Sequence, residues 1–192
     1  MFNGNLFLTD SGGLVGGYTD KTLQGLADIA NKEKVKSILV EENYGGGMFT
    51  KLLMPFIQRT YPVTIEEIRH STSKEKRILD VLEPLIQQHR LIVNRAVVLN
   101  DYQKTQDLYQ SSDQALRYQL FYQMSRLSKD KGSLAFDDRL DVLAMACKYW
   151  VEQLARDQEL AVKQRKDDLK REELDRFLDH QTFAKPVKNR WF

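Results

Sequence analysis

Two neighbouring glutamates, Glu41 and Glu42, stand where a short apolar run meets a glycine-rich turn. The run Ile38–Val40 shows no alternation, which indicates a strand buried on both faces of a mostly parallel sheet. Glycines at 45–47 and a helical pattern at 48–61 complete a βα unit, whose carboxyl end holds ligands in open α/β sheets. A carboxylate beside such a core favours a cation, although two solvated glutamates leaving a strand would give the same pattern. The glycines lack the Lys-Ser/Thr of a phosphate-binding loop.

A second acidic cluster, Asp137, Asp138 and Asp141, opens a long apolar helical pattern. Asp138 and Asp141 are three residues apart and therefore share one face of the first turn. One aspartate at a helix start is explained by capping and by the helix dipole. Three within five residues exceed that need and repel one another, which favours a bound cation. One of the three remains a candidate for the helix cap alone.

Composition bounds the class of protein. The chain has 192 residues, a net charge of +2 and 29% charged residues, so any basic surface must be local. Its one cysteine, Cys147, lies in an apolar run and is interpreted as a small core residue in a reducing compartment. There is neither an apolar run of about 18 residues nor a signal peptide, which predicts a soluble cytoplasmic protein that does not interact with membranes.

Hydrophobic periodicity predicts an α/β domain over residues 1–155 and a charged helical extension with a basic tail over 156–192. The strands are expected at 5–9, 38–40, 63–68 and 91–93, and the helices at 20–33, 48–61, 73–89, 100–110, 114–128 and 136–180. A polar break is expected at 111–113, a charged turn at 129–132 and an aromatic end to the tail at 182–192. The helix at 136–180 is expected to be buried in its first half and solvated from Arg156 onward.

The N-terminus reads as half of a β-hairpin. Asn3-Gly4 is a strong turn signal, and Asn5–Thr9 reads as the strand that leaves the turn. Only Met1 and Phe2 precede it, which is too short for an entering strand. A loose terminus is the alternative.

Three blocks taken together resemble the nuclease domain of phage terminase large subunits, of the short-tailed phage type: VEENYGGGMF, SKEKRILDVLEPLIQQHRLIV and FYQMSRLSKDKGSLAFDDRLDVLAMA. The likeness covers about residues 3–150. It implies an RNase H-like mixed sheet flanked by helices, with a long C-terminal helical extension. It also implies a DNA endonuclease that cuts concatemeric DNA during packaging by two-metal hydrolysis with Mg²⁺ or Mn²⁺.

The resemblance implies a ligand set of Glu41, Asp138 and Asp141, with Asp137 adjacent. The family's first acid belongs to an Asp-Pro-Ser/Ala-Gly block on strand one, and that block and the Walker ATPase domain are missing here. The chain is therefore predicted to be a fragment of a longer reading frame that lacks the first strand and has weak or no activity alone. Asp10 is the alternative first acid, although its place after the turn assigns it to strand two.

Basic residues before a helix, Lys74, Lys76 and Arg77, correspond to positions where the family carries DNA-contacting cations, although a solvated helix start would read similarly. Double-stranded DNA, the portal or procapsid and the ATPase domain of the full-length protein are the implied partners, in the host cytoplasm. Two other functions stay open: a catalytically incomplete interaction module of the packaging machinery, and a resolvase-like nuclease. The missing strand predicts a vacant slot between 6–9 and 37–40, which we expect self-association to cover.

Overall fold

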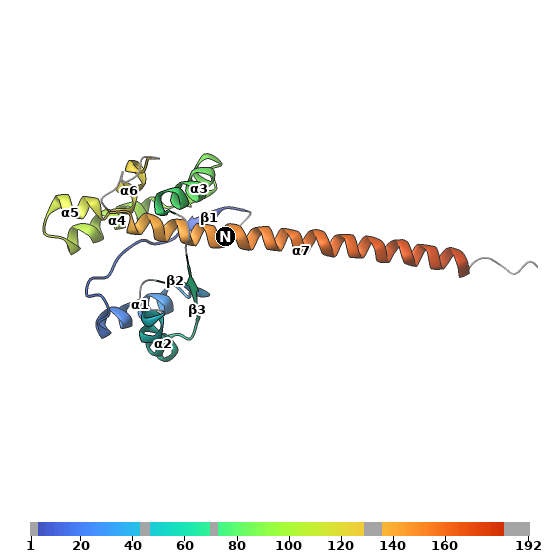
Figure 1. Ribbon diagram of the computed structural model, residues 1–192, viewed down its shortest axis with the longest axis horizontal. Coiled ribbons are helices and arrows are strands. Elements are labelled where there is room, and N and C mark those ends of the chain that lie inside the picture. Colours follow the sequence, from blue (N-terminus) through green and yellow to red (C-terminus); the bar gives the residue numbers. More distant parts are fainter. Residues whose placement is uncertain (1–3, 43–46, 70–72, 129–135, 183–192) are drawn as a thin grey trace, which may run out of the picture. The chain divides into compact units, whose positions relative to one another are not determined.

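A computed structural model describes residues 4–42, 47–69, 73–128 and 136–182, with side chains as far as residue 178 (Figure 1). The chain separates into two compact units, Met1–Lys148 and Tyr149–Phe192. Residues 1–3 of the expected half-hairpin, the glycines at 45 and 46, the turn at 129–132 and the tail from 183 lie outside the described residues. The first unit contains mixed α and β elements, and the second consists of the later part of one long helix.

The described elements alternate between short strands and helices. The strands are β1 (Leu6–Leu8), β2 (Ser37–Glu41), β3 (Thr64–Ile68) and β4 (Leu91–Val93). The helices are α1 (Asp20–Lys32), α2 (Met48–Thr60), α3 (Lys74–Gln87), α4 (Arg95–Leu108), α5 (Ser112–Arg117), α6 (Leu120–Arg126) and α7 (Asp138–Thr182).

The strands form two separate parallel pairs, which differs from the single mixed sheet expected from the resemblance. In one pair β1 lies beside β4, with Leu6 opposite Leu91. In the other, β2 lies beside β3, with Ser37 opposite Thr64 and Glu41 opposite Ile68. Within the described ranges β1 and β2 do not pair with each other, so each has one edge without a strand neighbour. The expected slot between them holds no described strand, and its coverage by self-association stays a prediction.

Each pair of strands packs into its own apolar cluster within the first unit. One cluster joins α1 and α2 to β2 and β3 through residues such as Leu23, Leu53 and Ile57. The other joins β1, α3 and α6 to the start of α7 through residues such as Ile78, Leu120 and Leu140. Both clusters are built from residues at helical spacing on α1, α2, α3 and α7, which is why the sequence pattern located these helices.

Two helical boundaries differ from the pattern for local reasons. Helix α4 begins at Arg95 rather than near residue 100, because the Asn94 side chain accepts a hydrogen bond from Ala96 N at 2.9 Å and caps the helix. The helix expected over 114–128 is divided into α5 and α6, with an extended backbone at Gln119 between them. The polar break placed at 111–113 is the start of α5.

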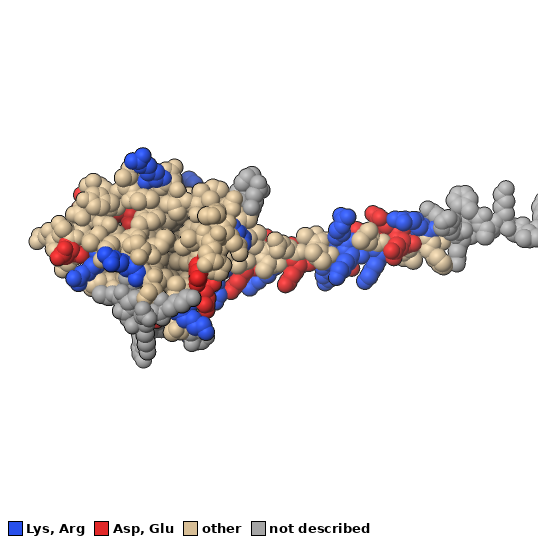
Figure 2. Space-filling view, turned by 90° about the horizontal axis from the view of Figure 1, so that it is seen from above, with Lys and Arg blue, Asp and Glu red and all other residues tan. Residues whose placement is uncertain are grey.

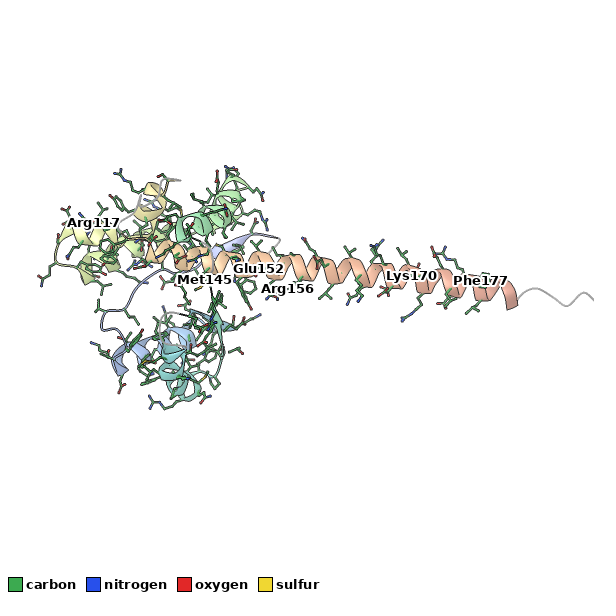
Figure 3. The ribbon with its side chains drawn as sticks, viewed as in Figure 1. Arg117, Met145, Glu152, Arg156, Lys170 and Phe177 are labelled. Atoms are coloured by element: carbon green, nitrogen blue, oxygen red, sulfur yellow. The ribbon has the colours of Figure 1, made fainter. Side chains whose placement is uncertain are left out.

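The second unit is an exposed helix. Its leucines at 160 and 174 are 58% and 56% exposed, and Phe177 is 58% exposed, so this stretch contributes no described core of its own. Acidic and basic side chains are interleaved along it (Figure 2), and the labelled Arg156, Lys170 and Phe177 lie along its length (Figure 3). None of the described helices is both long enough and apolar enough to span a bilayer.

The first half of α7 is buried on one side only. Leu140, Leu143 and Ala144 are buried as expected, whereas Val142 is 60% exposed, so the apolar pattern is wider than the surface that the core covers. Burial also raises the pKa of the Cys147 thiol to about 11.

Because thiolate is the nucleophile, the native chain at pH 8 should react with iodoacetamide about 100-fold more slowly at Cys147 than the chain unfolded in urea. Mass spectrometry of timed samples measures this ratio. Equal rates in the native and unfolded chains would contradict the buried position of Cys147.

Candidate functional site

Glu41 and Glu42 lie at the carboxyl end of β2, as the apolar run and its polar tip predicted. Glu41 is the last residue of β2 and is partly exposed, at 39%. Glu42 follows it and accepts hydrogen bonds from Nε and Nη2 of Arg69, which lies just beyond the end of β3. The two glutamates are therefore not equivalent, since Glu42 is held by an exposed arginine and Glu41 faces another set of side chains.

The turn before α2 also approaches β3 closely. Gly47 precedes the helix with φ of +77°, in the left-handed region that favours glycine. A Cβ at this position would lie 2.7 Å from Glu67 Oε1, so a side chain would collide with that carboxylate. The exposed Glu67 side chain can turn aside, so the left-handed backbone conformation is the main reason for glycine at this position.

The first turn of α7 presents its acids to Lys74 of α3. The Lys74 Nζ atom lies 2.6 Å from Asp137 Oδ1, 2.9 Å from Asp138 Oδ1 and 3.8 Å from Asp141 Oδ2. The side chain of Asp138 is 76% exposed, whereas that of Asp141 is 8% exposed. One ammonium group thus contacts three carboxylates that differ strongly in their access to solvent.

Arg77, one turn after Lys74, connects Asp141 to Glu41. Its Nη2 atom donates to both Asp141 oxygens, at 2.6 and 2.7 Å, and Nε lies 3.3 Å from Oδ1. The same Nη2 atom lies 3.8 Å from Glu41 Oε1. The Arg77 side chain is 7% exposed, so this is a buried pair in which the guanidinium satisfies the carboxylate.

The charges around Lys74 stabilise its protonated form. Partial burial lowers the pKa of the ammonium group, but the hydrogen bonds and attraction of Asp137 and Asp138 outweigh burial, and the pKa is raised above its ordinary value. Lys74 is therefore positively charged at neutral pH. It offsets part of the repulsion among the aspartates that the sequence pattern had indicated.

A cavity of about 660 Å³ adjoins these groups. Its acidic wall includes Glu41, Asp138 and Asp141, together with Glu67, and Lys74 also lines it. Its remaining wall is largely apolar and runs along β2 from Ser37 to Val40 and onto α1 and α2. Val142 of α7, which is exposed to solvent, also lines this cavity. Its apolar side chain therefore faces the cavity and not the core.

Glu41, Asp138 and Asp141, the ligands implied by the resemblance, all line this cavity, and Asp137 lies beside them; their binding of a metal ion stays a prediction. Asp10, the alternative acid, instead forms an ion pair with Lys104, with Nζ 2.6 Å from Oδ1. Burial raises the pKa of Asp10, and hydrogen bonds from Lys104 and the Ser11 N–H outweigh burial and lower it below its ordinary value. In the described contacts Asp10 has no partner in the carboxylate cluster.

Lys74 and Arg77 were predicted as phosphate contacts, and their described partners are carboxylates. Lys76 between them is exposed. The spacing of Lys74 and Arg77, three residues apart on one face of α3, matches that of Asp138 and Asp141 on α7. This shared spacing is the signal in the sequence from which the ion pairs between α3 and α7 could have been predicted. Only the fold shows that the two helix faces meet. Contact of these residues with DNA stays a prediction.

The donor set is suited to a hard divalent cation, although it is not arranged as a finished metal centre. Glu41, Asp137, Asp138 and Asp141 supply four carboxylates, and two cationic side chains contact them, which leaves an excess of negative charge. Carboxylate oxygens are the ligands that Mg²⁺ and Mn²⁺ prefer. Among the residues that the structure describes, no three His, Cys, Asp or Glu side chains converge on one point. The acids converge on Lys74 and Arg77 instead.

Comparisons with known proteins agree on one family. The family model for the bacteriophage T7 terminase ribonuclease H-like domain matches residues 1–91. The large terminase subunit of Enterobacteria phage T3 is 42% identical over 147 residues, which is 77% of this chain and 25% of that protein. The chain thus spans about a quarter of the length of this relative.

Proposed function

Since residues 1–91 belong to the ribonuclease H-like domain family of T7-type terminases, we propose that this chain is the metal-dependent DNA endonuclease domain of a phage terminase large subunit. It would cut concatemeric DNA during genome packaging, by phosphodiester hydrolysis with two divalent ions. One observation carries the proposal. Carboxylates from two distant parts of the chain, Glu41 on β2 and Asp138 and Asp141 at the start of α7, line one cavity, and Asp137 lies beside them on Lys74.

Glu41, Asp138 and Asp141 are the proposed holders of Mg²⁺ or Mn²⁺. When bound between carboxylates, such ions lower the pKa of an attacking water and stabilise the leaving oxygen of a phosphodiester. Asp138, the most exposed of the acids, is free to turn toward an incoming ion. Asp141 has both oxygens fixed by Arg77 and would supply a rigid ligand.

Lys74 and Arg77 act as counterions in this proposal. Four carboxylates at one site would repel one another, and the two cations keep them together when the acids hold no ion. Lys74 has a flexible stem and contacts the exposed Asp138, so its ammonium group can move aside when a divalent ion competes for the same oxygens. Arg77 is buried and bidentate and would stay in place.

We also propose partners for this chain, by analogy with a complete terminase large subunit. Double-stranded DNA is the substrate, and the exposed Lys76 is a phosphate contact at the edge of the site. An ATPase domain of the same protein and the portal or procapsid would complete the packaging machine in the host cytoplasm. The basic tail at 182–192, of which residues 183–192 lie outside the described residues, is the proposed contact with the portal or procapsid.

A second candidate is an interaction module without catalytic activity. Two observations favour it. No three metal-ligand side chains converge among the described residues, and Lys74 and Arg77 already form ion pairs with the acids. In that case Lys74 and Arg77 would be permanent partners of the carboxylates, and the chain would bind within the packaging machine without cutting DNA.

Calorimetric titration of the 192-residue chain with Mn²⁺ separates the two candidates. The nuclease proposal expects saturable binding that weakens more than about 100-fold in Glu41→Gln, beyond the usual effect of losing a supporting residue. Asp10→Asn is the matched control, because it removes an acid outside the cluster, and its affinity should stay within about twofold of the parent. A folded parent chain that binds no Mn²⁺ would favour the interaction module.

A further inference from the structure

The first turn of α7 is held from two sides by different groups. Its outer members, Asp138 and Asp141, face Lys74 and Arg77. The two residues between them, Arg139 and Leu140, are bound by buried polar side chains from other helices. Neither of these polar side chains has a part in the chemistry proposed so far.

Gln123 of α6 caps α7 from outside the helix. Its side chain is fully buried, Oε1 accepts a hydrogen bond from Leu140 N at 3.2 Å, and Nε2 donates to Arg117 O at 3.0 Å. The Arg117 side chain projects from α5 (Figure 3). The first N–H groups of a helix have no partner within the helix, so the Gln123 oxygen satisfies one of them. Caps normally come from the residue before the helix, whereas this one joins three helices.

Asp101 of α4 holds the neighbouring residue. It is 1% exposed, its Oδ1 accepts from Arg139 Nη1 at 2.7 Å and its Oδ2 accepts from Phe121 N at 3.4 Å. The Arg139 side chain is 10% exposed, so this too is a buried pair whose charges are mutually satisfied. Asp101 thereby ties the start of α6 to the residue beside Asp138.

We propose that Gln123 and Asp101 are positioning residues that set the orientation of Asp138 and Asp141 at the carboxylate cluster. This inference rests on the proposed function, because the orientation matters only if the acids hold metal ions. A buried polar side chain is costly unless its hydrogen bonds are made, and each of these residues makes one of its hydrogen bonds to the turn that carries the acids. Supporting residues of this kind typically change metal affinity by 10–100-fold.

The test compares two buried substitutions in the 192-residue chain. Gln123→Leu keeps side-chain volume but loses the bond to Leu140 N, and the Mn²⁺ dissociation constant should rise about 10–100-fold. Thr105→Val is the matched control. Thr105 is also fully buried, but in the described contacts its hydroxyl donates to the Asp101 and Tyr102 carbonyls of its own helix and not to the turn that carries the acids, so this variant should lose stability without losing affinity.

A conservative variant and an exchange measurement distinguish positioning from general support. Gln123→Glu keeps an acceptor for Leu140 N and, because full burial favours the protonated carboxyl, a donor for Arg117 O, so it should recover most of the Mn²⁺ affinity. In Gln123→Leu without metal, hydrogen exchange of the Leu140 amide should rise about fivefold or more, while the Ile78 amide in α3 keeps its rate. If Gln123→Leu does not fold, Asp101→Asn, which keeps an acceptor for Phe121 N and removes the charge facing Arg139, should show the same loss of affinity.

The outcomes are separable. A folded Gln123→Leu chain with parental Mn²⁺ affinity would overturn the positioning role and leave the proposed function intact. An equal loss in Thr105→Val would overturn it as well, because affinity would then follow stability. A parent chain that binds no Mn²⁺ would end both the proposed function and this inference.

Discussion

Replacing Arg77 with methionine is expected to lower the free energy of unfolding by about 3–5 kcal/mol. The guanidinium is buried and contacts both oxygens of Asp141, which is itself almost fully buried, so the variant leaves a buried carboxylate without its main partner. For a chain of this size that corresponds to a fall in melting temperature of about 6–20 °C. Urea unfolding followed by circular dichroism measures the loss.

Two companion variants make this result specific. Lys76→Met changes an exposed cation on the same helix and should stay within about 0.5 kcal/mol of the parent. The double variant Arg77→Met with Asp141→Leu removes both charges and should recover much of the stability, because a buried ion pair can be replaced by apolar side chains at little cost. Parental stability of Arg77→Met alone would show that the pair is not buried as described.

Asp138→Asn should have the opposite profile: nearly parental stability and loss of DNA cleavage. Its side chain is 76% exposed, so the variant forfeits only the exposed contact with Lys74 and the favourable charge at a helix start, about 1 kcal/mol or less. If Asp138 holds a metal ion, cleavage should fall more than about 100-fold, beyond the usual effect of losing a supporting residue. Relaxation of supercoiled plasmid in Mn²⁺ buffer measures the rate.

This assay suits a chimera in which the matching residues of this chain replace the 147 matched residues of the phage T3 terminase large subunit. Asp10→Asn in the same chimera is the control, since Asp10 pairs with Lys104 away from the cluster, and it should cut at the parental rate. Cleavage lost in Asp10→Asn and kept in Asp138→Asn would exchange the roles of the two acids.

The sequence predicted the two acidic segments of the site because each carries a strong local signal. Ile38–Val40 is a dense apolar run that ends in glutamates, and the aspartates open a helical segment that is apolar nearly all round. The family resemblance then placed Glu41 with Asp138 and Asp141. The cations were assigned to DNA because their position before a helix was visible, whereas their pairing with acids 64 residues away is set by the tertiary fold.

The strand pairing could not be predicted from the sequence, for a different reason. β1 and β4 have only three residues each, too few to specify a partner by pattern, and they pair across more than 80 residues of chain. The division of 114–128 into α5 and α6 has a similar origin. Gln123 lies inside an amphipathic pattern, but its side chain is used to join Arg117 O to Leu140 N, and that contact depends on the completed fold.

Plasmid cleavage is the decisive test of the proposal that the carboxylates of β2 and α7 form the cutting site of a metal-dependent nuclease. The measurement is the rate at which the parent chimera nicks supercoiled double-stranded DNA with Mn²⁺, with Mg²⁺ and with excess chelator. The account predicts cleavage with either ion, none with chelator, and none with Mn²⁺ when Glu41 is changed to glutamine. Cleavage that persists at the parental rate in Glu41→Gln, or a folded parent chimera that leaves the plasmid intact with both ions, would contradict it.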